Sequence, residues 1–311
     1  MKNMLQKIHT EIWPWYNPGS RLFFVNIIAS ALISLVFLII YHRHSLMHIF
    51  NSKNLTKYWL NSSAILDYKI YLINGIIKVM LFAPVLGLSF YFSKYTIKFL
   101  FLIQPNLEPY SGGFISFLFA TIFVYVWDDF LRFIHHYLMH TNAFLWQLHK
   151  THHSAEVLTP FTLYRIHPLE SLMAMVRNSL SFGVSGGILM FLFSGKVDFV
   201  TLFGINIFGS IFNLAYGNLR HSHIDISFGW FEHVLISPKQ HQIHHSKNPD
   251  HFNKNFGVGL AFWDKLLGTL MVSKNQKIIS FGVQGTNADS LAEQFWPWKN
   301  HKVPGSVCEL N

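Results

Sequence analysis

The sequence has 311 residues, of which 51% are hydrophobic, 17% aromatic and only 13% charged. Typical soluble domains carry about 25% charged residues, so this composition disfavours an ordinary soluble protein and indicates a membrane protein. The formal charge of +9 comes without a Lys/Arg block of nucleic-acid type, so we expect anionic lipid head groups and no nucleic acid as its partner, and the single Cys308 excludes an internal disulfide.

Two apolar stretches in the first third of the chain are expected to be transmembrane helices. Leu22 to Tyr41 has no charged residue, and at 1.5 Å per residue it crosses a hydrocarbon core of roughly 30 Å. Ile70 to Phe92 is expected to be a second span, with only Lys78 inside it. Pro105 and Pro109, followed by two glycines, then predict a connector.

The next apolar stretch, Gly112 to Trp127, runs into the segment DDFLRFIHHYLMH without a proline or further glycine. We therefore expect one helix that begins in the bilayer and carries His136 and His140 out of it. Asp129, the candidate catalytic carboxylate at this exit, has two interpretations. It is either solvated at the interface or oriented near a metal site as a partner of its ligands.

Residues 171–193 and 199–216 form a further apolar pair, joined by the short polar link 194–198. Such a link predicts an antiparallel membrane hairpin over residues 171–216. A hairpin returns the chain to the side that it left, so the histidines before and after it share one compartment. Residues 218–311 are then expected to be a mostly soluble cap.

These elements predict an all-α, integral-membrane helical bundle of about four to five apolar helices. A helical, histidine-rich cap would hold a site for two metal ions. Positive charge in residues 42–57 and in the histidine-bearing segments favours placing that site on the cytoplasmic face of a multi-pass protein.

Eight histidines occur in three blocks, one H-x-x-x-H and two H-x-x-H-H. Residues three or four apart lie on the same face of a helix, so each block can point into one small space. Neutral imidazole binds iron, copper, zinc and nickel, and eight of them suffice for two transition-metal ions. Zinc-finger cysteines and the His-Glu-x-x-His protease motif are missing. The blocks are His136 and His140; His149, His152 and His153; and His241, His244 and His245.

The order and spacing of these blocks resemble the fatty acid hydroxylase and sterol desaturase superfamily, the integral-membrane di-iron oxygenases. The resemblance covers about residues 125–270 and extends to motifs between the blocks. These motifs are Asp129, Arg165-Ile166-His167-Pro168-Leu169-Glu170, His221-Ser222-His223-Ile224, Pro238, Asn255-Phe256-Gly257, Trp263-Asp264 and Gly268-Thr269.

The resemblance implies that the eight block histidines bind two iron ions and that His221 is a ninth ligand. His223 and His167 are further candidates. His223 stands where relatives often have asparagine, and His167 instead caps a helix if Pro168 begins one. His135 shares a helix with His136 but points about 100° away, so we do not expect it to be a ligand.

The resemblance also implies domains and chemistry. It divides the chain into a membrane region, a hydroxylase-type catalytic domain and a tail, at residues 1–125, 126–270 and 271–311. The implied reaction uses O2 and two irons to hydroxylate a C–H bond of a fatty acyl, sterol or related lipid. A desaturase with the same site is the alternative.

Electrons are expected from a separate small redox protein with an NAD(P)H reductase, because the chain has no Gly-x-Gly-x-x-Gly fingerprint. A non-catalytic membrane metal carrier would need histidines or carboxylates along several spans, whereas here the histidines gather at one face. The expected docking surface for the redox protein is the basic part of the cap, with Lys239, Lys247, Lys254 and Lys265.

Overall fold

The computed structural model describes residues 23–41, 52–110, 113–194, 217–286 and 289–298. In these ranges all regular elements are helical and no strand occurs, which confirms the all-α prediction. The elements are α2 (Phe24–Tyr41), α4 (Ser52–Trp59), α5 (Ser62–Ile103), α6 (Phe114–Thr141), α7 (Ala143–His153), η3 (Thr162–Tyr164), α8 (Pro168–Phe193), η5 (Leu219–His221), η6 (Gly229–His233), α11 (Pro238–His244), η7 (Pro249–His251), α12 (Phe262–Leu267) and α13 (Leu291–Phe295).

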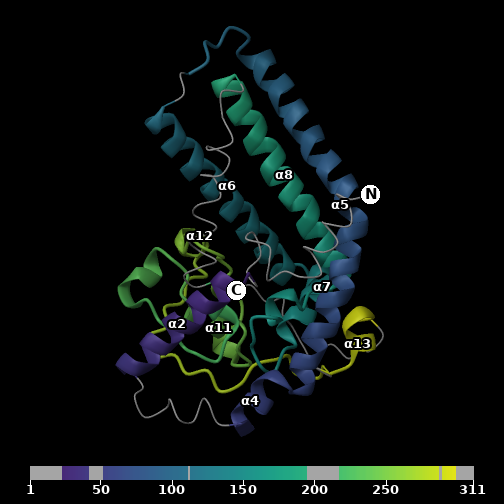
Figure 1. Cartoon of the computed structure of the whole chain (residues 1–311), viewed down its shortest axis with the longest axis vertical. Coiled ribbons are helices and arrows are strands. Elements are labelled where there is room, and N and C mark those ends of the chain that lie inside the picture. The colour runs from purple at the N-terminus through teal and green to yellow at the C-terminus, as the bar shows by residue number, and fades with distance from the viewer. Residues whose placement is uncertain (1–22, 42–51, 111–112, 195–216, 287–288, 299–311) are drawn as a thin grey trace.

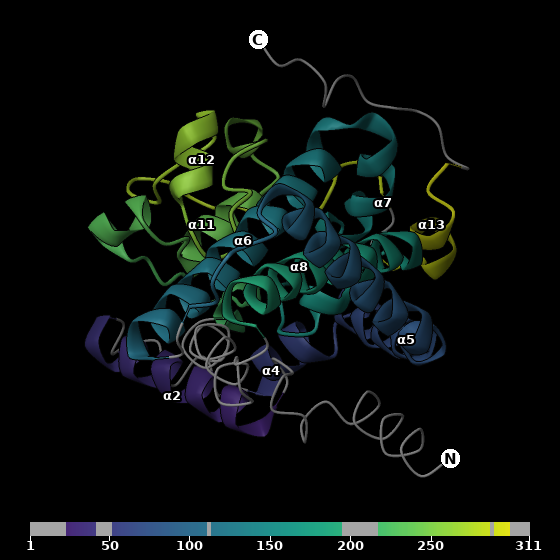
Figure 2. The same ribbon diagram turned by 90° about the horizontal axis from the view of Figure 1, so that it is seen from above.

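The three long helices α5, α6 and α8 run together away from the short elements that carry most of the histidines (Figure 1). Viewed from above, α8 lies between α6 and α5 (Figure 2). Two glycines of α8 allow its backbone to approach α5. A Cβ at Gly183 would lie 2.5 Å from Phe92 Cβ, and one at Gly187 would lie 2.8 Å from Thr96 Cβ, so only glycine fits without a shift at either position.

Helices α6 and α8 are long and apolar enough to cross a membrane, and the apolar stretch of α2 is shorter. Helix α2 buries polar side chains and exposes apolar ones, which is the opposite of a helix on the surface of a soluble protein. Ser30 and Ser34 are buried, and the hydroxyl of each donates to the carbonyl four residues earlier, whereas Ile28 is 54% exposed. Exposed apolar faces of this kind are typical of contact with lipid, and they indicate a membrane protein.

Helix α5 is longer than the span expected over residues 70–92. It runs for 42 residues, because Asn61 caps its start by accepting a hydrogen bond from Ser63 N–H and no residue breaks it before Gln104. Pro84 lies within it. The apolar segment 199–216 lies outside the described residues, so the hairpin remains a prediction.

A buried ion pair fixes α7 against α5. Arg165 Nη1 lies 3.0 Å from Asp67 Oδ1, and both side chains are fully buried. The same guanidinium donates to Thr151 O at the end of α7 and to Ser154 Oγ just beyond it. Nε, Nη1 and Nη2 of Arg165 therefore all donate hydrogen bonds, as a buried charge requires.

The C-terminal residues that the structure describes, 289–298, contact the same end of α7. Thr151 Oγ1 donates to Gln294 O at 3.0 Å, and Ser154 Oγ donates to Gln294 Oε1 at the same distance. Lys150 Nζ donates to Pro297 O. The end of α7 is thus held both by Arg165 and by residues 289–298, which fixes the direction of its histidines.

Candidate metal centre

A single asparagine reverses the chain between α6 and α7. Asn142 follows α6, and its Oδ1 accepts hydrogen bonds from the N–H groups of Phe144 and Leu145 in the first turn of α7. A helix start leaves its first backbone N–H groups without intrahelical acceptors, and the Asn142 side chain accepts from two of them. The reversal brings the histidines of α7 beside His136 and His140.

Helix α11 begins with a complete capping box. Ser237 Oγ accepts from Gln240 N–H at 3.1 Å, and Gln240 Oε1 accepts from Ser237 N–H at 2.9 Å. Pro238 occupies the first helical position, where its fixed φ favours helix and its missing N–H costs nothing. The box fixes the start of the helix that carries His241 and His244.

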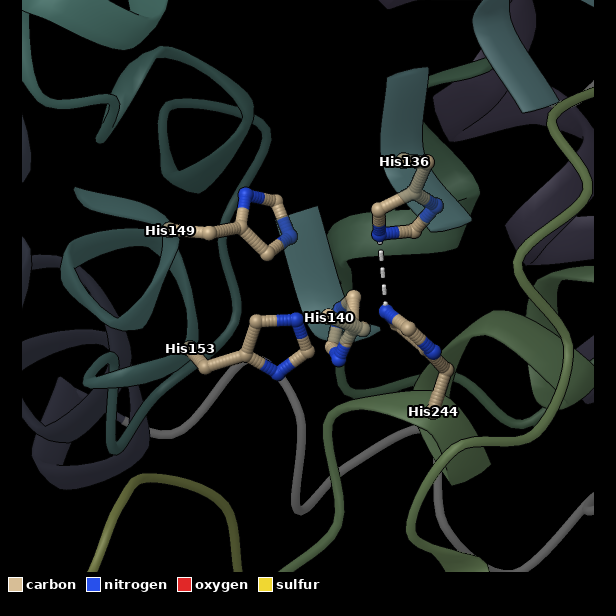
Figure 3. Close-up of side chains that lie close together, drawn as sticks. All are labelled: His136, His140, His149, His153 and His244. Atoms are coloured by element: carbon tan, nitrogen blue, oxygen red, sulfur yellow. Dashed lines mark hydrogen bonds between the residues drawn. The ribbon is translucent and has the colours of Figure 1, made fainter. Parts of the chain in front are cut away.

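Five histidines from α6, α7 and α11 form the first group, which we call the five-histidine cluster. One ring nitrogen of each lies within 4.8 Å of the others, and Nε2 of His136 and His244 are 3.0 Å apart. Figure 3 shows the five rings around one space. The members are His136, His140, His149, His153 and His244.

The remaining block histidines and His221 form the four-histidine cluster. Nε2 of His221 lies 3.2 Å from Nε2 of His152 and 3.0 Å from Nε2 of His241, and Nε2 of His245 lies 3.2 Å from that of His241. Nitrogen ligands about 2.1 Å from one metal ion stand about 3 Å apart, so this spacing fits a shared ion.

Neighbouring histidines in the sequence belong to different clusters. His152 and His153 are adjacent but point about 100° apart on a helix, and their ring planes are 87° apart. His244 and His245 divide in the same way. The two clusters adjoin, because the rings of His153 and His245 stack with centroids 4.4 Å apart.

Several converging nitrogens are buried without a protein partner. Nε2 of His140, His149 and His153 has no hydrogen-bond partner in the described structure. A buried polar atom left unsatisfied costs about 1–3 kcal/mol. A cation bound among these three lone pairs would satisfy them together, so the five-histidine cluster passes this test of fit to a metal ion.

Five of the cluster histidines that follow α6 are held in the neutral form that binds metals. Burial lowers the pKa of His152 and of His244 to about 3. Burial, followed by the neighbouring rings, also lowers the pKa of His153 and of His245 well below its ordinary value, and burial followed by the Arg220 charge does the same for His241. Because neutral imidazole is the ligating form, these five rings need not first lose the proton of a charged imidazolium at pH 7.

Three rings of the five-histidine cluster donate through Nδ1 to a fixed acceptor. His136 bonds to Phe256 O, His244 to Lys254 O and His149 to Glu170 Oε1, each at 2.7 Å. Donation from Nδ1 leaves the lone pair on Nε2, facing the cluster. Sequence reasoning missed Glu170 as a partner, although it stands in the Arg165-to-Glu170 motif.

Arg220 ties the four-histidine cluster to the neighbouring loop. Its guanidinium lies 2.8 Å from His241 Nδ1 and donates to Val258 O and Gly257 O. A guanidinium only donates, so His241 Nδ1 is the acceptor and the proton of the neutral ring is on Nε2, which must lose that proton when a metal binds there. This residue directly precedes His221 and was also missed from the sequence.

The candidate carboxylate Asp129 lies on α6 and is buried. Its Oδ1 accepts from Gly259 N–H, and its Oδ2 accepts from Leu260 N–H and Trp263 Nε1. Each of these hydrogen bonds runs to the loop after the last histidine block. Asp129 therefore fixes this loop against α6. Its carboxylate bonds to backbone N–H groups and to Trp263, and not to a cluster histidine.

Asp264 fixes the other side of the same loop. Its carboxylate accepts from the N–H groups of Phe256 and Gly257 and from Thr269 Oγ1. The loop in turn supplies Phe256 O to His136. The Asn-Phe-Gly, Trp-Asp and Gly-Thr motifs thus form one hydrogen-bonded support.

His167 and His223 lie outside both clusters. His167 caps α8, because its Nδ1 accepts from Leu169 N–H directly after Pro168, which is the alternative left open for the motif. His223 is exposed and stacks on Tyr58 with ring centroids 4.2 Å apart. The structure brings together the other nine candidate histidines.

Comparison with known proteins agrees with the site geometry, because the matched residues include both histidine clusters. Residues 121–269, which include both clusters, match the fatty acid hydroxylase family. This match, together with the curated relatives, supports placing the chain in the fatty acid hydroxylase and sterol desaturase superfamily. No solved structure is detectably similar to it.

Curated lipid-modifying enzymes resemble the chain at modest identity. Ornithine lipid hydroxylase OlsE of Rhizobium tropici is 28% identical over 216 residues, which are 68% of this chain and 59% of the relative. The alkylglycerol monooxygenase of Homo sapiens is 26% identical over 153 residues, or 49% of the chain and 30% of the relative. The match spans less than two thirds of each relative.

Proposed function

We propose that this chain is a membrane-bound di-iron oxygenase that uses O2 to hydroxylate a C–H bond of a lipid. The observation that carries the proposal is the pair of adjoining clusters of buried histidines, five in one and four in the other. The relatives, a lipid hydroxylase and an alkylglycerol monooxygenase, support hydroxylation of a fatty acyl, sterol or related lipid.

The donor set fits iron, since it offers neutral imidazoles, which suit iron and resist oxidation better than thiolates. Iron held there would supply the O2-dependent oxidation of an unactivated C–H bond. The ligands we propose are the nine members of the two clusters. Around them, Glu170 orients His149, backbone carbonyls orient His136 and His244, and burial of the rings excludes bulk water.

In the balanced reaction, the lipid C–H becomes C–OH with one oxygen atom of O2. The other oxygen atom takes up two electrons and two protons and leaves as water. We propose that a separate small redox protein with an NAD(P)H reductase delivers the electrons at the basic part of the cap, around Lys254 and Lys265.

We also propose a multi-pass protein with its metal centre at the cytoplasmic face. Helices α6 and α8 support membrane insertion, and basic residues near the histidine-bearing segments support that orientation. Fusion of a reporter enzyme after residue 298 tests it, because a reporter active only in the periplasm or lumen should stay silent.

Lipid analysis of cells tests the reaction. Cells expressing the chain should form a lipid with one added oxygen atom, labelled when 18O2 is supplied, and His152→Ala should abolish it. His233→Ala is the matched control, because His233 is exposed and lies in neither cluster. A product that lacks two hydrogens and gains no oxygen would show desaturation instead and contradict the proposal.

A further inference from the structure

A line of polar residues lies between the two candidate membrane helices, and we call it the polar seam. Positions four and seven apart share one face of a helix, so the α6 members form one stripe. Ser181 Oγ donates to Asp128 Oδ1 at 3.0 Å and so joins α8 to α6. The seam consists of Asp128, Arg132 and His135 on α6 and Glu170, Arg177 and Ser181 on α8.

Both acidic groups of the seam already bond to another side chain, although Glu170 Oε2 is buried without a hydrogen-bond partner. Asp128 Oδ2 lies 2.6 Å from Arg132 Nε, and Asp128 Oδ1 accepts from Ser181. Glu170 Oε1 is bonded to His149. Neither carboxylate forms an ion pair with the second guanidinium of the seam, that of Arg177.

Arg177 lies in the seam without an ion pair to any carboxylate of the described residues. Its Nη2 donates to the neutral amide of Asn178 at 2.7 Å, and its Nε is buried without a hydrogen-bond partner. No carboxylate of the described residues lies within 4.0 Å of its guanidinium. Arg132, Asp128 and Glu170 all lie within electrostatic range, so two arginines share two carboxylates, each of which is already bonded to another side chain.

An arginine inside a membrane helix is costly unless it meets an anion, so it marks a functional site. Its planar fork matches the two oxygens of a phosphate or a carboxylate. We propose that Arg177, with Arg132 beside it, binds the anionic group of the lipid substrate, a phosphate or a carboxylate.

The position of the seam suits an anchor for a substrate. Glu170 both belongs to the seam and holds His149, and His135 directly precedes the cluster member His136. Arg177 is seven residues beyond Glu170 on α8, which is roughly 10 Å along a helix. An anion held there would place carbons close to the head group at the five-histidine cluster. This inference rests on the proposed lipid oxygenase function.

Native mass spectrometry of the full chain in a neutral detergent tests the anchor. The probes are dioleoyl phosphatidylglycerol, oleate and the neutral dioleoylglycerol. The intact chain should retain at least one of the two anionic probes about ten times better than dioleoylglycerol, and Arg177→Gln should remove that preference. Arg177→Lys should keep part of it. Lys94→Gln, which removes an exposed charge from α5, is the matched control and should change nothing.

Comparison of the two anionic probes shows whether the site prefers a phosphate or a carboxylate. Unchanged retention of both by Arg177→Gln, or an equal fall for dioleoylglycerol, would overturn the proposal, as would loss of the preference in a metal-loaded Arg177→Lys. If that happens while the oxygenated lipid still forms, the proposed function stands and only the anchor is wrong. An intact chain without oxygenated product or iron would refute the function itself.

Discussion

Glu170 Oε1 lies 2.7 Å from His149 Nδ1, and both side chains are buried. The contact joins the first turn of α8 to the last turns of α7, so one carboxylate couples a candidate membrane helix to the five-histidine cluster. A carboxylate behind a ligating imidazole fixes the ring and makes it a stronger donor.

Loss of this carboxylate should weaken metal binding. We expect Glu170→Gln to lower metal affinity about 10-fold, because the amide still accepts the hydrogen bond without the charge, and Glu170→Ala about 100-fold. Competition with a chelator of known affinity measures both. Equal affinity of the intact chain and Glu170→Ala would remove this role.

Breaking the buried pair of Arg165 and Asp67 should destabilise the fold. Loss of one partner leaves an uncompensated buried charge, so Asp67→Asn should lower the free energy of unfolding by roughly 3–5 kcal/mol. The double variant Asp67→Leu/Arg165→Met should be less affected than the single variant. Denaturant unfolding in detergent measures the free energy of unfolding of each variant. A double variant that loses more stability than the two single variants lose together would contradict the pairing.

The close contact of α8 with α5 gives a matched pair of glycine tests. A Cβ at Gly187 would meet Ser93 O at 2.9 Å, so Gly187→Ala should cost about 1–3 kcal/mol. A Cβ at Gly186 has open space, so Gly186→Ala should be neutral or stabilise the helix by up to about 1 kcal/mol. Thermal unfolding of the two variants should differ in this order, and the reverse order would refute the packing.

Acid should destabilise the metal-free protein. The folded pKa of His152 and His244 is about 3, below the value of about 6.5 in an unfolded chain. Stability is therefore full above about pH 6.5 and falls as the pH drops towards 3, by up to about 1.4 kcal/mol per unit for each histidine, because only the unfolded chain takes up protons. Thermal unfolding of chelator-treated protein between about pH 7.5 and about pH 5 measures this. A constant Tm would contradict it.

Local rules predict part of the centre. The absence of a breaker before His136 predicted one helix through residue 140, and α6 confirms it. The four-residue spacing placed His136 and His140 on one face, as the structure shows. Both follow from the geometry of a single helix, which the sequence encodes directly.

The division of the histidines into two clusters depends on how distant segments cross. His153 joins His136 while its neighbour His152 joins His221, and no spacing within one helix fixes that choice. The contact of Glu170 with His149 likewise needs the placement of α8 against α7. Tertiary contacts of this kind leave no periodic signal in the sequence.

The most direct test of the metal centre is the iron content of the purified chain, measured by mass spectrometry against protein concentration. Two clusters predict about two irons per chain, falling to about one in a variant that disrupts a single cluster, such as His140→Ala or His221→Ala. The exposed-histidine control His233→Ala should keep both. A chain with one iron or none, or with iron unchanged in both cluster variants, would contradict a di-iron centre.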